Sequence, residues 1–120
     1  MKIINANVLS APDTASQTGT AIDSSQIYQA TFQPIFGDTT VTGGTVSVQM
    51  SNDIPPVNYA QGQFTPTNWS AIPNASSTIT SGVASPIILS TVSARWLRVV
   101  FTVGRAGTST INTTMFGVCV

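Results

Sequence analysis

Hydrophobic and polar residues alternate along much of this chain, and the clearest case is the segment 44–51. Val46, Val48 and Met50 share one face of this segment, and Thr, Ser and Gln residues occupy the other. An alternation of period two is typical of a β-strand with one buried and one solvated face. The segment therefore predicts a strand on the surface of a core.

A second alternating segment, 25–36, places Tyr28, Ala30 and Phe32 on one face. Pro34 lacks an N–H donor for a sheet ladder, so it predicts an edge position or the end of this strand. The Gly- and Thr-rich residues 37–44 that follow carry the turn chemistry of a hairpin or of a short connection.

The stretch 94–107, ARWLRVVFTVGRAG, holds three of the four cations of the chain. At strand period one face carries Leu97, Val99, Phe101 and Val103, and the other carries Trp96, Arg98, Val100 and Thr102. Since both faces are largely apolar, we expect a central strand with the core on one side and a covering segment on the other.

Residues 51–74 interrupt this pattern with four of the seven prolines, and they predict a long loop with a short strand near 69–72. Further short alternating runs follow up to the C-terminus. Six to eight short strands without helical periodicity indicate an all-β fold, a single-domain antiparallel β-sandwich or jelly roll over residues 1–120. Residues 1–25 are weakly patterned, and we expect them to form an extended N-terminal arm.

Charged residues make up only 7% of the 120 residues, the formal net charge is zero, and the chain contains neither His nor Glu. The usual general bases are therefore missing, and the Asp residues share no motif, so we expect no enzymatic activity. One Cys without His cannot form a zinc site. Calcium is the only plausible metal, with oxygen ligands near residues 37–40 and 51–56, but turn formation explains these residues equally well, and we expect neither metal nor cofactor.

The weak overall field also gives no reason to expect binding to nucleic acid or to a membrane. No stretch reaches the length of a membrane span, and the N-terminus lacks the apolar run of a secretion signal.

Arg98 is the one cation expected on a covered face, where a guanidinium group needs an acceptor. The sequence leaves four candidates for this acceptor: Asp53, Asp38, a backbone carbonyl, or a group on a second subunit. The question for the structure is which of them Arg98 meets.

Three aromatic residues, Tyr59, Phe64 and Trp69, lie in the Pro-rich loop region. Aromatic residues on the loops of a sandwich stack on sugars or anchor a protein interface. Alternatively, they fold back as a lid over one end of the sandwich, which is the interpretation that we favour for Trp69.

Three segments of the chain together resemble a pattern of small virion structural proteins of tailed bacteriophages. They are TVSVQMSND (45–53), PTNWSAIPN (66–74) and ARWLRVVFTVGRAGTSTINTTMFG (94–117). The resemblance implies a non-enzymatic capsid decoration or cement protein, or a minor tail component. Its expected partner is the major capsid protein or another virion protein, and it would act as a homo-dimer or homo-trimer. It would be assembled in the host cytoplasm and lie on the capsid surface, with Trp96, Arg98, Tyr59, Phe64 and Trp69 as candidate interface residues.

The strand ending VQMSND and the late RWLRV strand also resemble discoidin-like carbohydrate-binding sandwiches. That resemblance implies a sugar site on loops at one end of the sandwich, with Tyr59, Phe64, Trp69 and Asp53 as candidates. A tail-associated adhesion module would combine the two alternatives.

Overall fold

The computed structural model describes residues 2–59 and 63–119, and these residues form strands and no helix. The strands are β1 (Lys2–Pro12), β2 (Gln17–Thr18), β3 (Ile22–Asp23), β4 (Ile27–Phe36), β5 (Thr42–Ser51), β6 (Ser70–Thr78), β7 (Ile87–Leu89), β8 (Trp96–Arg105) and β9 (Thr110–Cys119). The described residues therefore contain no helix that could cross a membrane.

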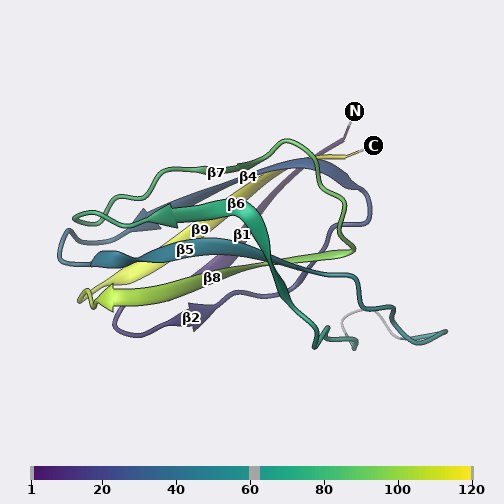
Figure 1. Ribbon diagram of the computed structural model, residues 1–120, viewed down its shortest axis with the longest axis horizontal. Coiled ribbons are helices and arrows are strands. Elements are labelled where there is room, and N and C mark those ends of the chain that lie inside the picture. The colour runs from purple at the N-terminus through teal and green to yellow at the C-terminus, as the bar shows by residue number, and fades with distance from the viewer. Residues whose placement is uncertain (1, 60–62, 120) are drawn as a thin grey trace.

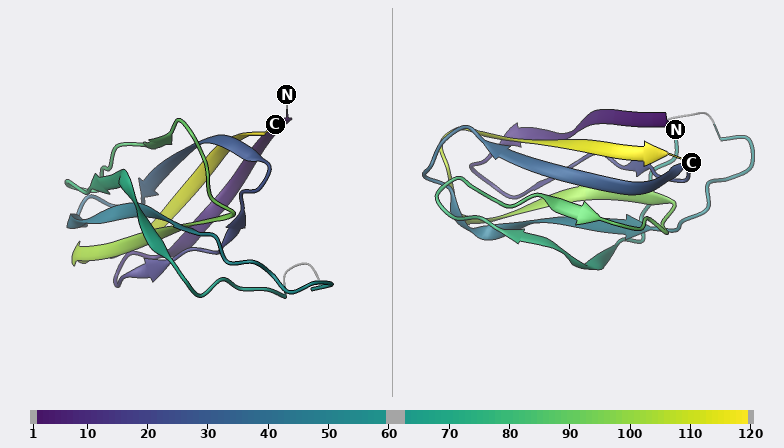
Figure 2. Two further views of the ribbon diagram at one scale, coloured as in Figure 1. Left: turned by 45° about the vertical axis from the view of Figure 1, so that its right-hand side comes forward. Right: turned by 90° about the horizontal axis from the view of Figure 1, so that it is seen from above.

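The strands form two antiparallel sheets packed face to face, as Figures 1 and 2 show. One sheet has the order β1-β9-β4-β7, and the other has the order β2-β8-β5-β6, with β3 also paired to β8. If β2 and β3 count as one interrupted strand, successive strands alternate between the sheets except at β5 and β6. This is the connectivity of a jelly roll, and the predicted single-domain β-sandwich is confirmed.

The core lies between the two sheets and consists of the inward side chains of alternating positions. Phe32, Leu97, Phe101, Ile111 and Met115 are each at most 1% exposed. Each side chain of this kind contributes about 1.5–3 kcal/mol when it is fully buried. The two sheets therefore adhere through a row of large apolar side chains that the strand periodicity supplies.

β8 is a central strand, as predicted. It pairs with β5 along one edge and with β2 and β3 along the other. Leu97, Val99 and Phe101 face the core with no exposed surface. The opposite face of β8 carries Trp96 and Arg98, which a segment described below covers.

Tyr28 does not share the face of Ala30 and Phe32, so this prediction is wrong. The pairing of β4 with β9 shifts by one residue between Ile27 and Gln29, which turns Ile27 into the core and leaves Tyr28 41% exposed. A bulge of this kind reverses the faces on one side of the shift.

Pro34 does not end β4, because the strand continues to Phe36 and Pro34 itself faces Thr113 of β9. On the other side of β4, β7 pairs only with residues 30–32. Pro34 therefore stands where β4 is locally an edge, which is the other position that its missing donor allows. Residues 37–41 cross from one sheet to the other, and of the two predicted alternatives they are the short connection.

The prediction of an extended N-terminal arm is wrong, because the first part of this segment is strand β1 of the sandwich. Residues Lys2–Pro12 pair with β9 over its whole length, from Lys2 opposite Cys119 to Pro12 opposite Thr110. Val8 and Leu9 are both buried at a register shift in this strand. The segment looked unpatterned because its remaining inward positions, Ile4, Ala6 and Ala11, are only partly buried.

Candidate functional site

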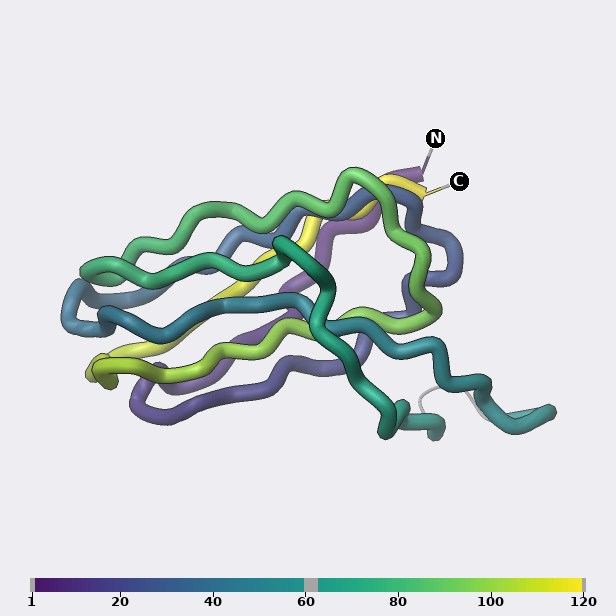
Figure 3. Tube along the Cα trace, viewed as in Figure 1, coloured from purple at the N-terminus to yellow at the C-terminus, as the bar shows by residue number. Residues whose placement is uncertain are grey.

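The connection between β5 and β6, here called the β5–β6 loop (residues 52–69, described at 52–59 and 63–69), projects from one end of the sandwich in Figures 1 and 3. It leaves β5 and returns to the neighbouring strand of the same sheet. The described part of the loop contacts the outer face of β8. All five candidate residues of the sequence, Tyr59, Phe64, Trp69, Trp96 and Arg98, meet there.

Asp53 holds the two limbs of the loop together. Its Oδ2 accepts hydrogen bonds from the backbone N–H groups of Thr67 (2.8 Å) and Asn68 (3.1 Å), and its Oδ1 accepts one from Asn68 Nδ2 (3.0 Å). These bonds, led by that of the Asn68 side chain, lower the pKa of Asp53 because they favour its charged form. The carboxylate serves as a structural acceptor at the loop base.

Three aromatic rings pack in series from the loop onto β8. Tyr59 meets Phe64 edge-on with centroids 6.1 Å apart, and Phe64 lies 5.7 Å from Trp96. Trp96 is 7% exposed and donates its indole N–H to the carbonyl of Asp53 at 3.0 Å. The aromatic loop residues therefore fold back as a lid over β8, one of the two predicted alternatives.

Arg98 meets none of the acceptors that the sequence suggested within the described chain. Its Nε donates to Oε1 of Gln49, the residue directly opposite on β5, at 2.8 Å. Its guanidinium carbon lies 4.3 Å from the centroid of the Trp69 ring, a cation–π arrangement. Partial burial lowers the pKa of Arg98, and no carboxylate of residues 2–59 or 63–119 offsets this effect.

Gln49 is thus a site residue that the sequence analysis missed. In the sequence Gln49 lies between Val48 and Met50, and its side chain points to the solvated face of β5. A neutral amide at such a position does not indicate a site. The register of β5 against β8 identifies it, because residues directly opposite on one face touch.

A hollow of about 560 Å³ opens beside this cluster, and we call it the Arg98 hollow. Its walls are Thr18, Gly19, Thr20, Ala21, Asp23, Tyr59, Phe64, Thr65, Trp96 and Arg98. Small-molecule sites usually have volumes of about 300–1,000 Å³ and mix apolar walls with a few polar groups. The hollow therefore has the size and the lining of a binding site.

The described residues do not assemble catalytic chemistry at this cluster. Its polar groups include an arginine, an amide, threonine hydroxyls, the Tyr59 phenol and the exposed carboxylate of Asp23, which already accepts bonds from Ser25. In residues 2–59 and 63–119, no three Cys or Asp side chains come together as metal ligands. The arrangement can bind a ligand, but it offers no poised nucleophile with a base.

The second candidate surface is the outer face of the β1-β9-β4-β7 sheet, here called the neutral face. Its outward residues carry no charge: Ile3, Asn5, Asn7, Ser10, Gln29, Thr31, Gln33, Ile35, Ile88, Asn112, Thr114, Phe116 and Val118. Among them Ile88 is 70% exposed and Phe116 is 44% exposed.

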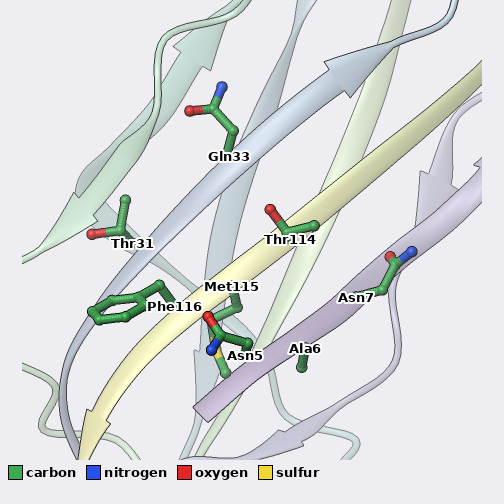
Figure 4. Close-up of a pocket in the computed structure, with 8 residues that line it drawn as sticks. All are labelled: Asn5, Ala6, Asn7, Thr31, Gln33, Thr114, Met115 and Phe116. Atoms are coloured by element: carbon green, nitrogen blue, oxygen red, sulfur yellow. The ribbon is translucent and has the colours of Figure 1, made fainter. Parts of the chain in front are cut away.

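Figure 4 shows part of this face, where side chains from β1, β9 and β4 line a hollow of about 400 Å³. Asn5, Phe116 and Thr31 form one row across the three strands, and Asn7, Thr114 and Gln33 form the next. No segment of the described chain covers these rows. The neutral face was not predicted as a site, because it appears only when the registers of four strands are combined.

Comparisons of the chain with protein-family models, with curated proteins and with solved structures found no match.

The contacts of Arg98 predict how its substitutions affect stability. Arg98→Ala removes the packing against Trp69 and leaves Gln49 Oε1 without its donor, so the free energy of unfolding should fall by about 1–2 kcal/mol. Arg98→Met keeps an unbranched stem against Trp69 and should cost less. Urea unfolding of both variants, with Gln49→Ala completing a double-mutant cycle, measures the coupling. An Arg98→Ala variant as stable as the parent would contradict this account.

The lowered pKa of Asp53 predicts that the loop contributes less to stability in acid. An unfolded Asp titrates near 3.9, so the stabilisation is complete above about pH 5 and is lost as pH falls through the lower pKa of the folded state. The free energy of unfolding should therefore drop less between about pH 5 and about pH 3 in Asp53→Asn than in the parent.

Asn68→Ala should shrink the same difference, because the Asn68 amide makes the largest contribution to the shift. Since Trp69 and Trp96 are the two tryptophans of the chain and both lie at the loop base, their fluorescence reports the transition. Equal pH dependence in the parent and in Asp53→Asn would show that the carboxylate does not hold the loop.

Proposed function

We propose that this chain is a capsid decoration protein of a tailed bacteriophage, which binds the major capsid protein and stabilises the head without catalysing a reaction. The observation that carries the proposal is the neutral face, a broad sheet surface without charge that nothing in the described chain covers. In this proposal the protein is assembled in the host cytoplasm and acts on the capsid surface as a homo-dimer or homo-trimer.

The composition of the neutral face suits permanent contact with another protein. Charged side chains are depleted at interface cores because burying them costs free energy, whereas aromatic residues are enriched there. Phe116 and Ile88 supply exposed apolar surface, while the Asn, Thr and Gln residues around them both donate and accept hydrogen bonds. The pattern fits a partner surface that is itself flat and neutral.

The resemblance to phage virion proteins supports the same proposal from the sequence side. The first motif runs from β5 into the β5–β6 loop, the second from the returning limb of that loop into β6, and the third through β8 into β9. They include the Asp53 anchor, Trp69 and Arg98, so they describe how the sandwich and its loop are built. The choice of partner rests on the neutral face.

Introducing charge on the neutral face tests the proposal. Thr114→Lys and Phe116→Asp should each reduce co-sedimentation with phage heads assembled without this protein by at least about tenfold, since each would bury an unpaired charge at the interface. Thr102→Lys, on the outer face of the other sheet, is the matched control and should bind as the parent does. Binding that survives both changes, or no binding by the parent, would refute the proposal.

A second candidate function, carbohydrate binding in the manner of a discoidin-like or tail-associated adhesion module, is favoured by the Arg98 hollow. Tyr59 is 37% exposed and Phe64 lies next to it in the wall, so their rings offer stacking surface for a sugar. Trp69 is less suited to this role, because the Arg98 guanidinium lies over its ring.

A glycan array separates the two functions. The decoration function predicts no signal on a broad array for the parent protein. A signal that Tyr59→Ala abolishes, while Tyr28→Ala at an exposed position of β4 preserves it, would establish the second candidate instead.

A further inference from the structure

Two Asp carboxyl groups that are far apart in the sequence meet at the end of the sandwich opposite the β5–β6 loop. Asp13 follows β1, and Asp38 lies in the connection from β4 to β5. Both hold the turn between β8 and β9, which Figure 1 shows at the far end from that loop. The side chain of Asp13 is within hydrogen-bonding contact of Asp38.

Asp13 has no exposed surface. Its Oδ1 accepts a hydrogen bond from the backbone N–H of Ser109 at 2.9 Å. Its own N–H donates to the Ser109 carbonyl (3.1 Å), and its carbonyl accepts from the Gly107 N–H (3.2 Å). Its Oδ2 is buried and has no donor among the described residues.

Asp38 likewise has one carboxylate oxygen that accepts hydrogen bonds and one that has no donor in the described chain. Its Oδ2 accepts from the Thr108 N–H (2.8 Å), the Thr108 hydroxyl (2.7 Å) and the Thr40 hydroxyl (2.8 Å). These bonds, the Thr108 backbone bond first, lower its pKa to about 2, so that this carboxylate is ionised at neutral pH. Its Oδ1, like Asp13 Oδ2, is buried without a donor in the described chain.

Each of the two neighbouring carboxyl groups thus keeps one buried oxygen for which the described residues supply no donor. Buried polar atoms without partners are rare in native proteins, and an unseen ion or water is one of the explanations that such atoms call for. Gly107 packs directly against the Asp13 carboxylate, and a Cβ at position 107 would collide with it. No cation of the described residues neutralises Asp38, since only hydrogen bonds lower its pKa.

We propose that a calcium ion binds between Asp13 Oδ2 and Asp38 Oδ1. Calcium prefers oxygen ligands, carboxylates above all, and accepts irregular coordination completed by carbonyl, hydroxyl and water oxygens. Magnesium requires a near-ideal octahedron, which two carboxylate oxygens on separate connections do not impose. With only two carboxylates the site should be weak, with a Kd of about 10⁻⁴–10⁻³ M, as in extracellular calcium modules.

The bound ion would join the β1 segment directly to the β4–β5 connection; these two segments flank β9 on opposite edges and do not pair with each other. Asp13 ends the β1 segment, Asp38 belongs to the β4–β5 connection, and both carboxylates already grip Thr108 and Ser109. The expected effect of calcium is therefore on stability.

Thermal unfolding measures this effect directly. The melting temperature of the parent in EDTA should rise saturably by roughly 4–12 °C as calcium chloride is added to about 10 mM, with ionic strength held constant by potassium chloride. Isothermal titration calorimetry with calcium chloride should give one site per chain.

Asp13→Asn isolates the site with the smallest change of shape. The new side chain keeps Oδ1 as acceptor for the Ser109 N–H and presents an amide donor toward Asp38 Oδ1. Its melting temperature in EDTA should equal or exceed that of the parent, and its response to calcium should be lost. Asp23→Asn, which removes the same charge from an exposed turn at the other end of β8, should respond as the parent does.

Three results would overturn the proposal: no calcium-dependent shift in the parent, an equal shift in Asp13→Asn, or an equal loss of response in Asp23→Asn. A parent whose melting temperature falls with rising pH in EDTA and ignores calcium would assign the pair to a shared proton instead. If Asp13→Asn does not fold, Asp38→Asn carries the same comparison.

Discussion

The loops of this sandwich depend on carboxylate oxygens that accept hydrogen bonds from backbone N–H groups. Each of the four acidic residues does this: Asp13 for Ser109, Asp23 for Ser25, Asp38 for Thr108, and Asp53 for Thr67 and Asn68. A loop N–H has no ladder partner, and a charged acceptor binds it about twice as strongly as a neutral one. In a chain with so few charges, the carboxylates are all used to fix the connections between strands.

This use of the carboxylates explains the environment of the arginine at the centre of β8. With every Asp engaged at a turn, Arg98 is held by an amide oxygen and an aromatic face, Gln49 and Trp69. Both partners are neutral, so the guanidinium keeps a net charge beside the Arg98 hollow. The cation-rich stretch of the sequence is thus a structural strand, and its central arginine is bonded to neutral groups, with the Asp23 carboxylate elsewhere in the wall of the same hollow.

Strand periodicity predicted the sandwich and the central position of β8, because alternation depends only on which residues face a core. Strand periodicity failed at the β-bulges, where one extra residue interrupts the two-residue alternation. The register shift beside Ile27 leaves Tyr28 exposed. The shift at Val8 and Leu9 interrupts the alternation of β1, so that this strand looked unpatterned in the sequence. Bulges depend on the partner strand, so a single segment does not contain the information that would reveal them.

The candidate site followed the same division. The aromatic residues lie in one Pro-rich loop region, which the sequence shows. They came together because a loop that returns to the neighbouring strand must bring its two limbs close. Gln49 and the meeting of Asp13 with Asp38 depend on which strands become neighbours, and this is set by the whole topology. Side chains that act through a partner distant in sequence carry no local signal.

The outer edge of β1 limits how the neutral face can continue onto another chain. Along its bulged half, Gly19 lies so close to the Val8 carbonyl that a Cβ there would collide with it, and the segment 17–20 lines that edge. The half from Lys2 to Ala6 has no such neighbour among the described strands, and its outward residues Ile3 and Asn5 belong to the neutral face. An unpaired edge offers free N–H and C=O groups to a further strand. Face and edge therefore meet at the start of β1, where backbone hydrogen bonding and neutral side-chain contact are available to the same partner.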